Sequence, residues 1–281
     1  MNSFVVASLP KTGLANKLTV WALAQAFAIE NDLPVMTIGW FDLKVGPWLR
    51  NEKSKRFYCG YFKNDFNLSL YMKYIWARIL GQIVIDPEKI SHSRSVFVFQ
   101  TIKYPKFAFS KINPYRESLS KKLETNLSTK IRKKLNALVP AQVGVHIRMG
   151  DFKTLSEDKE FKSIGRTRTP FNFFKDAIEK LSKKLGEKTT FLIFSDGKPS
   201  ELEEILKLNN VKLEDNNPDV VDLFLLSKCK IIVTSAGSSF SYWAAFLSKA
   251  DIIYHPNFKK SFFNSRSTFE GTVDEYVARI S

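Results

Sequence analysis

The sequence predicts an α/β protein with two Rossmann-like lobes. Residues 4–40 follow a β-turn-α-β pattern, and doubly wound α/β domains begin in this way. A second series of buried strands and helices starts at Val143, just after Pro140. The 281 residues are enough for two domains of ordinary size. We therefore expect one lobe at residues 1–139, a second at 140–281, and a site between them.

The first half of the chain opens with its clearest pattern. An apolar run at residues 4–9 predicts a strand, and residues 10–13 predict a turn. Residues 14–30 carry apolar side chains at helical spacing, and residues 34–40 predict a second strand. The chain is then aromatic and irregular as far as residue 95. The other elements expected in this half are a helix at 71–80, a strand at 96–100 and a helix at 115–138.

The second half begins with a β-branched apolar run at residues 143–147, which is typical of a strand buried on both faces. Residues 152–169 are polar and basic and predict a loop. Pro170 suits the first turn of the helix that follows this loop. The elements expected from there on are helices at 170–184, 201–208, 220–227 and 240–247, and strands at 190–194, 231–234 and 251–254.

Composition and charge narrow the class of protein. With 44% hydrophobic residues and no run of roughly 18 apolar residues, the chain reads as soluble and globular. Two cysteines, Cys59 and Cys229, cannot form a disulfide framework, so we expect a reducing compartment. The net charge of +15 favours an anionic partner, either nucleic acid, a membrane surface or a phosphorylated substrate. No nucleic-acid partner is expected, because no RNP, helix-turn-helix or KH signature is present.

The segment that points most directly to a site is residues 143–151, where a buried strand ends in polar groups. His146, Arg148 and Asp151 follow one another closely there, and ligands of open α/β sheets bind outside the carboxyl ends of the strands. Arg148 would present a rigid positive fork that suits a phosphate. The structural alternative is that Arg148 pairs with Asp151 only for stability.

A strand-to-helix turn near the N-terminus contains Gly13 and Asn16. The backbone amides at the start of such a helix can bind an anion or a sugar oxygen. The turn matches neither the dinucleotide fingerprint G-x-G-x-x-G nor a Walker loop. A simple helix-capping turn is the alternative reading.

Two later segments add oxygen and amide groups. Ser195 and Asp196 follow the expected strand at 190–194, and an acidic residue at this place can accept hydrogen bonds from a ribose or a base edge. Ser238, Ser239 and the amide of Phe240 open the expected helix at 240–247, where they can bind a phosphate. Capping of the following helix is the alternative in both segments.

In this order, the motifs resemble those of the α-1,2-fucosyltransferases that share an H-x-R-R-x-D motif and of their wider GDP-fucose-using superfamily. The resemblance rests on an early G-L-G-N-Q-like turn before an alanine-rich helix, a V-G-V-H-x-R stretch, an F-S-D stretch, a D-L-x-L stretch ending in S-x-C, and a serine-rich stretch with a tryptophan. These motifs stand at residues 13–18, 143–151, 194–197, 222–229 and 238–247. Three positions depart from the family pattern, namely Ala15, Met149 and Gly237.

The resemblance implies a GT-B fold and an inverting, metal-independent transfer of L-fucose from GDP-β-L-fucose. The acceptor would be the 2-hydroxyl of a galactoside in a bacterial surface glycan, such as an O-antigen, and it would bind the first lobe. By the same resemblance, Arg148 would grip the diphosphate and would act with Asp151. The remaining donor contacts would come from Gly13, Asn16, His146, Ser195, Asp196, Ser238, Ser239 and Phe240. We expect no metal and no cofactor.

The sequence leaves the finer function open. The same fold could use another nucleotide sugar or another acceptor position, and Met149 in place of a second arginine bears on the choice of donor. A non-catalytic sugar-binding module is a third reading, and a basic nucleic-acid-binding protein is a fourth. The basic surface fits a cytoplasmic enzyme with peripheral contact to the inner face of the membrane, where lipid-linked glycans would supply the acceptor.

Overall fold

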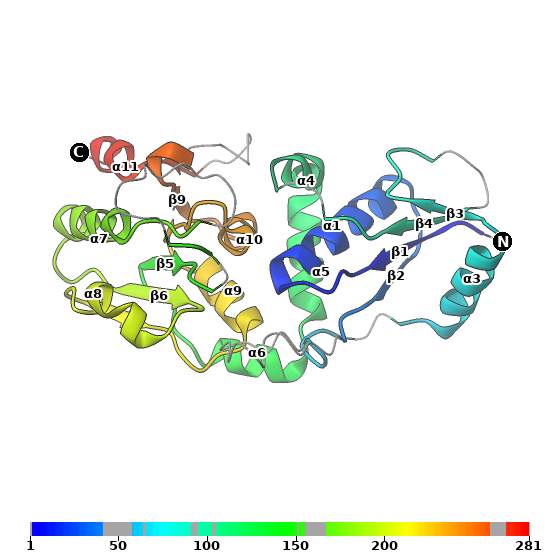
Figure 1. Cartoon of the computed structure of the whole chain (residues 1–281), viewed down its shortest axis with the longest axis horizontal. Coiled ribbons are helices and arrows are strands. Elements are labelled where there is room, and N and C mark those ends of the chain that lie inside the picture. The colour runs from blue at the N-terminus through cyan, green and yellow to red at the C-terminus, as the bar shows by residue number, and fades with distance from the viewer. Residues whose placement is uncertain are drawn as a thin grey trace. The chain divides into compact units, whose positions relative to one another are not determined.

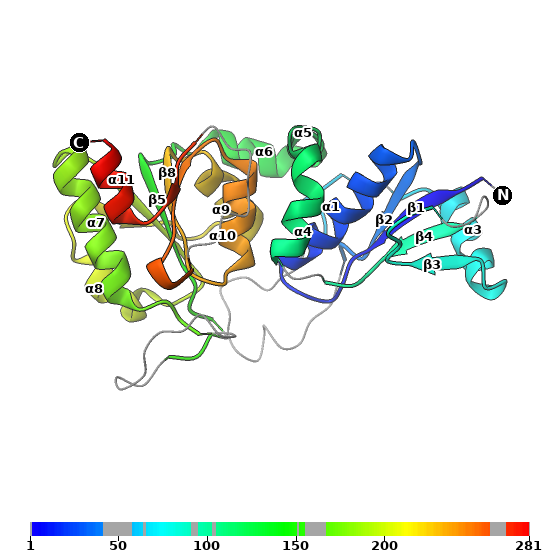
Figure 2. The same ribbon diagram turned by 90° about the horizontal axis from the view of Figure 1, so that it is seen from above.

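A computed structural model describes residues 2–41, 58–63, 66–90, 95–102, 105–150, 152–154, 167–258 and 268–280. The described residues form two compact units, of which the first extends to Arg132 and the second begins at Lys133. Each unit contains one parallel sheet with helices packed on it (Figures 1 and 2). The predicted α/β class is therefore confirmed. The roles that the sequence suggests for residues 1–139 and 140–281 stay predictions.

The first unit is a four-stranded sheet in the order β2-β1-β4-β3. Its strands are β1 (Phe4–Ser8), β2 (Val35–Ile38), β3 (Ile83–Ile85) and β4 (Val96–Phe99). One face is covered by α1 (Leu14–Glu30), from which Phe27 contacts Phe97 and Phe99. On the other face, Tyr74 and Ala77 of α3 (Leu68–Ile79) pack with side chains of β1 and β4. The short edge strand β3, with only three residues, escaped sequence prediction.

The prediction of one continuous helix over residues 115–138 is wrong. The structure has α4 (Pro105–Ile112), a 3₁₀ turn at Asn113–Tyr115, α5 (Arg116–Asn126) and α6 (Thr129–Asn136). Between α5 and α6, Leu127 adopts extended backbone angles, is fully buried and forms a β-bridge with Phe62. The hydroxyl of Ser128 then accepts a hydrogen bond from the amide of Ile131, which is how a serine begins a new helix. Burial of Leu127 therefore overrides the continuous helical pattern.

The second unit is a six-stranded parallel sheet in the order β10-β9-β8-β5-β6-β7. Relative to chain order, this is the 3-2-1-4-5-6 arrangement of a Rossmann fold, in which β5 and β8 are the neighbours where the order reverses. The strands are β5 (Val143–Ile147), β6 (Phe191–Ser195), β7 (Val211–Leu213), β8 (Ile231–Val233), β9 (Asp251–Ile253) and β10 (Glu270–Gly271).

Helices cover both faces of this second sheet. On one face lie α7 (Phe171–Leu185), α8 (Glu203–Leu206), which follows a 3₁₀ turn at Pro199–Glu201, and α11 (Val273–Arg279). On the other lie α9 (Asp219–Ser227) and α10 (Ser239–Leu247). A 3₁₀ turn at Pro256–Phe258 follows β9. Sequence patterns missed β7, β10, α4 and α11, of which the strands have two or three residues each. None of the helices in the described ranges is long and apolar enough to cross a bilayer.

Gly144 lets α9 approach β5 closely. A Cβ atom at this position would stand 2.5 Å from Cδ1 of Leu226 and 2.8 Å from Sγ of Cys229. All three residues are buried, so neither neighbour has room to move.

We expect the substitution Gly144→Ala to lower the free energy of unfolding by about 1–3 kcal/mol through overpacking. Chemical denaturation measures this loss. The double variant Gly144→Ala/Leu226→Ala should lose less than the sum of the two single variants, since the smaller side chain relieves the overlap. Strictly additive losses of unfolding free energy would show that the side chains at positions 144 and 226 do not overlap.

Candidate functional site

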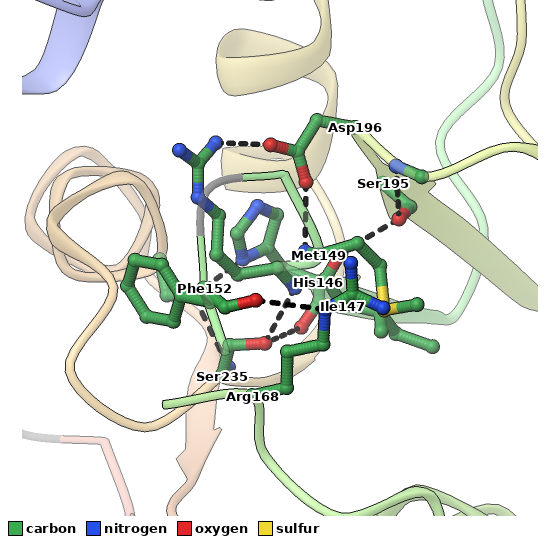
Figure 3. Close-up of polar contacts among 11 residues, drawn as sticks. His146, Ile147, Met149, Phe152, Arg168, Ser195, Asp196 and Ser235 are labelled. Carbon is green, nitrogen blue, oxygen red and sulfur yellow. Dashed lines mark hydrogen bonds and ion pairs between the residues drawn. The ribbon is translucent and has the colours of Figure 1, made fainter. Parts of the chain in front are cut away.

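Polar groups gather at the carboxyl ends of three neighbouring strands of the second unit. Arg148 follows β5, Asp196 follows β6 and Ser235 comes two residues after β8. In Figure 3, Asp196 and Ser235 lie on either side of His146 and Met149. Because the strand order reverses between β5 and β8, this edge is where open α/β sheets bind their ligands.

The side chain of Arg148 is held by a carboxylate. Its Nη1 atom forms an ion pair and hydrogen bond with Oδ2 of Asp196. Its guanidinium carbon also lies 5.4 Å from the ring centroid of Phe152, within the range of a cation–π contact. The Arg148 side chain keeps 23% of its surface exposed. The guanidinium is therefore fixed in direction while part of its surface stays accessible.

Asp196 holds two consecutive residues of the segment after β5. Its Oδ2 atom faces Arg148, and its Oδ1 atom accepts a hydrogen bond of 2.8 Å from the backbone amide of Met149. Gly150 makes this arrangement possible, because a Cβ atom there would overlap Oδ2 of Asp196. The sequence suggested Asp196 as a contact to the nucleoside. The structure shows it bonded to the arginine, and a donor contact stays a prediction.

Ser235 ties the end of β8 to the end of β5. Its hydroxyl donates to the carbonyl oxygen of His146 at 2.8 Å and accepts from the amide of Arg148 at 2.8 Å. The Ser235 amide donates in turn to the hydroxyl of Ser241 at 3.2 Å. Ser235 is not among the residues predicted from the sequence. Its position as the first serine after an apolar strand was the signal that could have found it.

Ser195 makes the corresponding link between β6 and β5. Its hydroxyl donates to the carbonyl oxygen of Ile147 at 2.7 Å and accepts from the amide of Gly197 at 3.0 Å. The side chain is buried. In this structure it therefore supports the edge on which Arg148 stands, while its predicted contact to a donor stays untested.

His146 lies beneath this edge as a buried ring. Its Nδ1 atom is 2.7 Å from the hydroxyl oxygen of Ser241, and its ring stacks on Phe240 with centroids 4.9 Å apart. Burial, followed by the positive charge of Arg148, lowers the pKa of His146 from its ordinary 6.5 to about 3. A neutral ring at physiological pH adds no charge to the site and fixes the start of α10 against β5.

This pKa shift makes stability depend on pH. Unfolded His146 binds a proton below about pH 6.5 and folded His146 only below about pH 3, so acid favours the unfolded state across that window. We expect the wild type to lose up to about 1.4 kcal/mol per pH unit below pH 6 relative to His146→Asn. Denaturation curves of both proteins at several pH values measure the difference. Parallel stability curves would show that His146 does not titrate in this way.

The serine-rich turn leads directly into α10. Ser238 is the N-terminal capping residue, with extended backbone angles and no side-chain bond to the helix amides. Its amide donates to the carbonyl oxygen of Ser235, and Gly237 has a φ of +72°, a conformation that favours glycine. The amide of Gly237 donates to the hydroxyl of Tyr242. Ser239 and Phe240 form the first turn of α10, where the helix dipole is positive.

Asp151 lies outside the described residues, so its part in the site is not seen. Gly13 and Asn16 belong to the first unit, and only their surroundings within that unit are described. Gly13 has a φ of −68° and nothing lies within 4 Å of a Cβ added to it. These backbone angles are open to any residue, and the predicted donor contact of Gly13 stays a prediction.

Met149 and Arg168 bear on which side chains bring positive charge to this edge of the sheet. Met149 is buried in the hydrophobic core between the sheet and α7, so it points away from Arg148. Arg168 lies close by, where its Nε atom donates to the carbonyl oxygen of Phe152 at 3.0 Å, as Figure 3 shows. Sequence reasoning treated Arg168 only as part of a basic loop. The neighbouring Thr169 accepts a hydrogen bond from the amide of Ala236, which brings this segment to the turn after β8.

The described residues contain no group of three or more His, Cys, Asp or Glu side chains that could hold a metal ion. The polar groups at this edge are of a kind that can bind an anion. A fixed guanidinium and the N-terminal end of a helix lie together at the edge of a Rossmann-type sheet, and phosphates bind at such places.

Comparison with known proteins identifies the family and the fold. The sequence model of Glycosyl transferase family 11 matches residues 48–272. No curated protein matches the chain. Among solved structures, NodZ alpha-1,6-fucosyltransferase co-crystallized with GDP is 14% identical, with a TM-score of 0.58 over 92% of this chain and 96% of NodZ.

Two further solved structures have the same fold. A mutant of Arabidopsis thaliana FUT1 in complex with GDP is 12% identical, with a TM-score of 0.52 over 92% of this chain and 73% of FUT1. POFUT1 in complex with GDP is 12% identical, with a TM-score of 0.51 over 96% of this chain and 97% of POFUT1. These likenesses confirm the expected GT-B fold.

Proposed function

The chain belongs to glycosyl transferase family 11, and from this we propose that it is an inverting α-1,2-fucosyltransferase. It would move L-fucose from GDP-β-L-fucose to the 2-hydroxyl of a galactoside in a bacterial surface glycan, such as an O-antigen. The observation that carries the proposal is the Arg148 guanidinium, fixed by Asp196 at the edge where the strand order reverses. Solved neighbours of the same fold are fucosyltransferases in complex with GDP.

The central step is departure of GDP from the anomeric carbon of fucose. As the C–O bond to the β-phosphate breaks, negative charge grows on the phosphate oxygens and must be stabilised. We assign this task to Arg148, which can grip two oxygens with its planar fork. The acceptor hydroxyl attacks from the opposite face of the sugar and releases its proton to solvent, so the β-linked donor gives an α-linked product. The arginine makes a metal or another cofactor unnecessary in this scheme.

The start of α10 would bind the same diphosphate. Ser238, Ser239 and the amide of Phe240 lie at the positive end of the helix dipole. The Ser235 bonds tie this turn to the backbone of Arg148, so the two anion-binding elements are held by one network. Preorganised donors of this kind need no rearrangement when charge develops.

The other predicted residues take supporting or acceptor-side roles. Asp196 holds the guanidinium of Arg148 in place, a task that the sequence suggested for Asp151. His146 and Ser195 would shape the nucleoside side of the site, and Gly13 and Asn16 keep their predicted donor contacts. We propose the first unit as the acceptor-binding lobe. A lipid-linked glycan would serve as acceptor, with the enzyme in the cytoplasm and in peripheral contact with the inner membrane face.

Thermal denaturation with a panel of nucleotides tests the choice of donor. At a concentration of about 100 times Kd, a ligand adds about 2.7 kcal/mol of stability. We expect GDP and GDP-fucose to raise the Tm by several degrees and UDP, UDP-galactose and single-stranded DNA to leave it unchanged. A shift with another nucleotide sugar instead would move the proposal to that donor. Binding of GDP-fucose without transfer to any galactoside would indicate a sugar-binding module.

A further inference from the structure

Helix α3 of the first unit exposes an unusual amount of apolar surface. Five exposed apolar side chains, four on α3 and one on the residue that follows it, lie at helical spacing along the outer side of the helix. Of these, Leu68, Trp76 and Ile79 are 66%, 58% and 68% exposed. We call this surface the α3 stripe. It consists of Leu68, Met72, Trp76, Ile79 and Leu80.

The α3 stripe is not needed to hold the helix on its sheet. The opposite side of α3 does this, because Tyr74 and Ala77 are buried against β1 and β4 and Leu70 packs beside them. The helix therefore has two apolar sides, of which the inner belongs to the core and the outer faces solvent. Soluble proteins seldom expose a contiguous apolar patch that contains a tryptophan unless something covers it.

Charge indicates what covers the stripe. Lys73 and Arg78 are exposed and, by helical periodicity, flank the stripe on either side; the guanidinium of Arg78 donates to the Tyr74 hydroxyl at 3.2 Å. The segment Leu68–Ile79 contains no acidic residue, and the whole chain carries a net charge of +15. An apolar strip that contains tryptophan and is bordered by cations is the composition of helices that rest in a bilayer interface.

A second copy of the chain fits this surface less well. In a symmetric dimer the same patch would face itself, so the lysine and arginine of one stripe would come near those of the other. No carboxylate on α3 could compensate for that repulsion. An anionic lipid surface instead provides apolar depth for the stripe and negative charge for its borders.

We propose that the α3 stripe docks the first unit on the surface of an anionic phospholipid bilayer, with Trp76 and its apolar neighbours inserted at the headgroup boundary. This inference rests on the membrane contact included in the proposed function and names the surface responsible for it. The proposed docking does not depend on which nucleotide sugar is the donor or on which sugar is the acceptor.

Sedimentation with lipid vesicles, in the absence of any nucleotide sugar, tests this proposal. The wild type should bind vesicles of phosphatidylcholine with phosphatidylglycerol and bind those of phosphatidylcholine alone much more weakly. The double variant Met72→Ser/Trp76→Ser should bind the anionic vesicles at least about tenfold more weakly, since it buries less apolar area. Lys73→Gln/Arg78→Gln should bind more weakly as well and lose most of its sensitivity to salt.

A matched control is available in Val139→Ser, which removes a side chain 85% exposed outside α3 and should bind like the wild type. All variants should keep the circular dichroism spectrum of the wild type and should transfer fucose to a soluble acceptor at the wild-type rate. Loss of vesicle binding alone would therefore concern the membrane surface, and loss of transfer alone would concern the proposed donor. Equal vesicle binding by the stripe variant and the wild type would overturn the proposal, as would no binding by the wild type. A wild-type dimer that Met72→Ser/Trp76→Ser dissociates would assign the stripe to a second copy and would overturn it too.

Discussion

Replacing Arg148 by lysine or by alanine should abolish most fucosyl transfer. Lysine keeps the positive charge but lacks the planar fork that meets both the diphosphate and Asp196. Loss of one preorganised donor to a developing oxyanion typically lowers kcat by about a hundredfold to a thousandfold, and we expect both variants to fall in that range. Release of GDP from GDP-fucose in the presence of a galactoside measures the loss.

Arg279→Lys provides a matched control for this experiment. Arg279 lies on α11 of the same unit, and its guanidinium contacts the ring of Phe269 at 5.6 Å, much as Arg148 contacts Phe152 at 5.4 Å. We expect it to transfer fucose like the wild type. Turnover by Arg148→Lys within a few-fold of the wild type would rule out a bidentate clamp, whatever the stability of the variant.

Asp196→Asn should produce the second-largest effect. An asparagine can still accept the hydrogen bond from the Met149 amide, but it no longer pairs a negative charge with Arg148. A misplaced catalytic group can cost about a hundredfold in rate, and we expect kcat to fall about tenfold to a hundredfold with little change in Tm. Steady-state kinetics on the purified variant measure both kcat and KM.

Double variants show whether Asp196 acts through Arg148. If it does, Asp196→Asn should add little to the defect of Arg148→Lys, so the two changes are strongly non-additive. Glu204→Gln is the control, because its ion pair with Lys175 is exposed on α8 and should contribute nothing to transfer. Additive defects, or a rise in KM with unchanged kcat, would mean that Asp196 contacts the donor independently of the arginine.

The sequence predicted the elements that form the site better than the contacts within it. The apolar run of β5 and the polar residues after it identified Arg148, because a strand buried on both faces has a distinctive composition. The roles of Asp196 and Ser235 depend on β5 pairing with β6 on one side and β8 on the other. That pairing joins residues far apart in the chain and has no local signature. The sequence likewise predicts only a basic loop around Arg168, because its contact with Phe152 has no local signature either.

Local pattern also failed where tertiary burial outweighed it. The helical spacing of residues 115–138 is regular, but Leu127 enters the core and breaks the helix. The exposure of the α3 stripe could not be predicted either, because a helix with two apolar sides looks like a fully buried one in sequence.

Product analysis by NMR is the decisive test of α-1,2 transfer through Arg148. The wild type is incubated with GDP-β-L-fucose and a β-galactoside in the presence of EDTA, and the anomeric signal and linkage of the new sugar are assigned. We expect α-L-fucose on the 2-hydroxyl of galactose, formed by the wild type and by Arg279→Lys but not by Arg148→Lys. A β-linked product, a requirement for divalent metal, or the same product from Arg148→Lys would contradict this expectation.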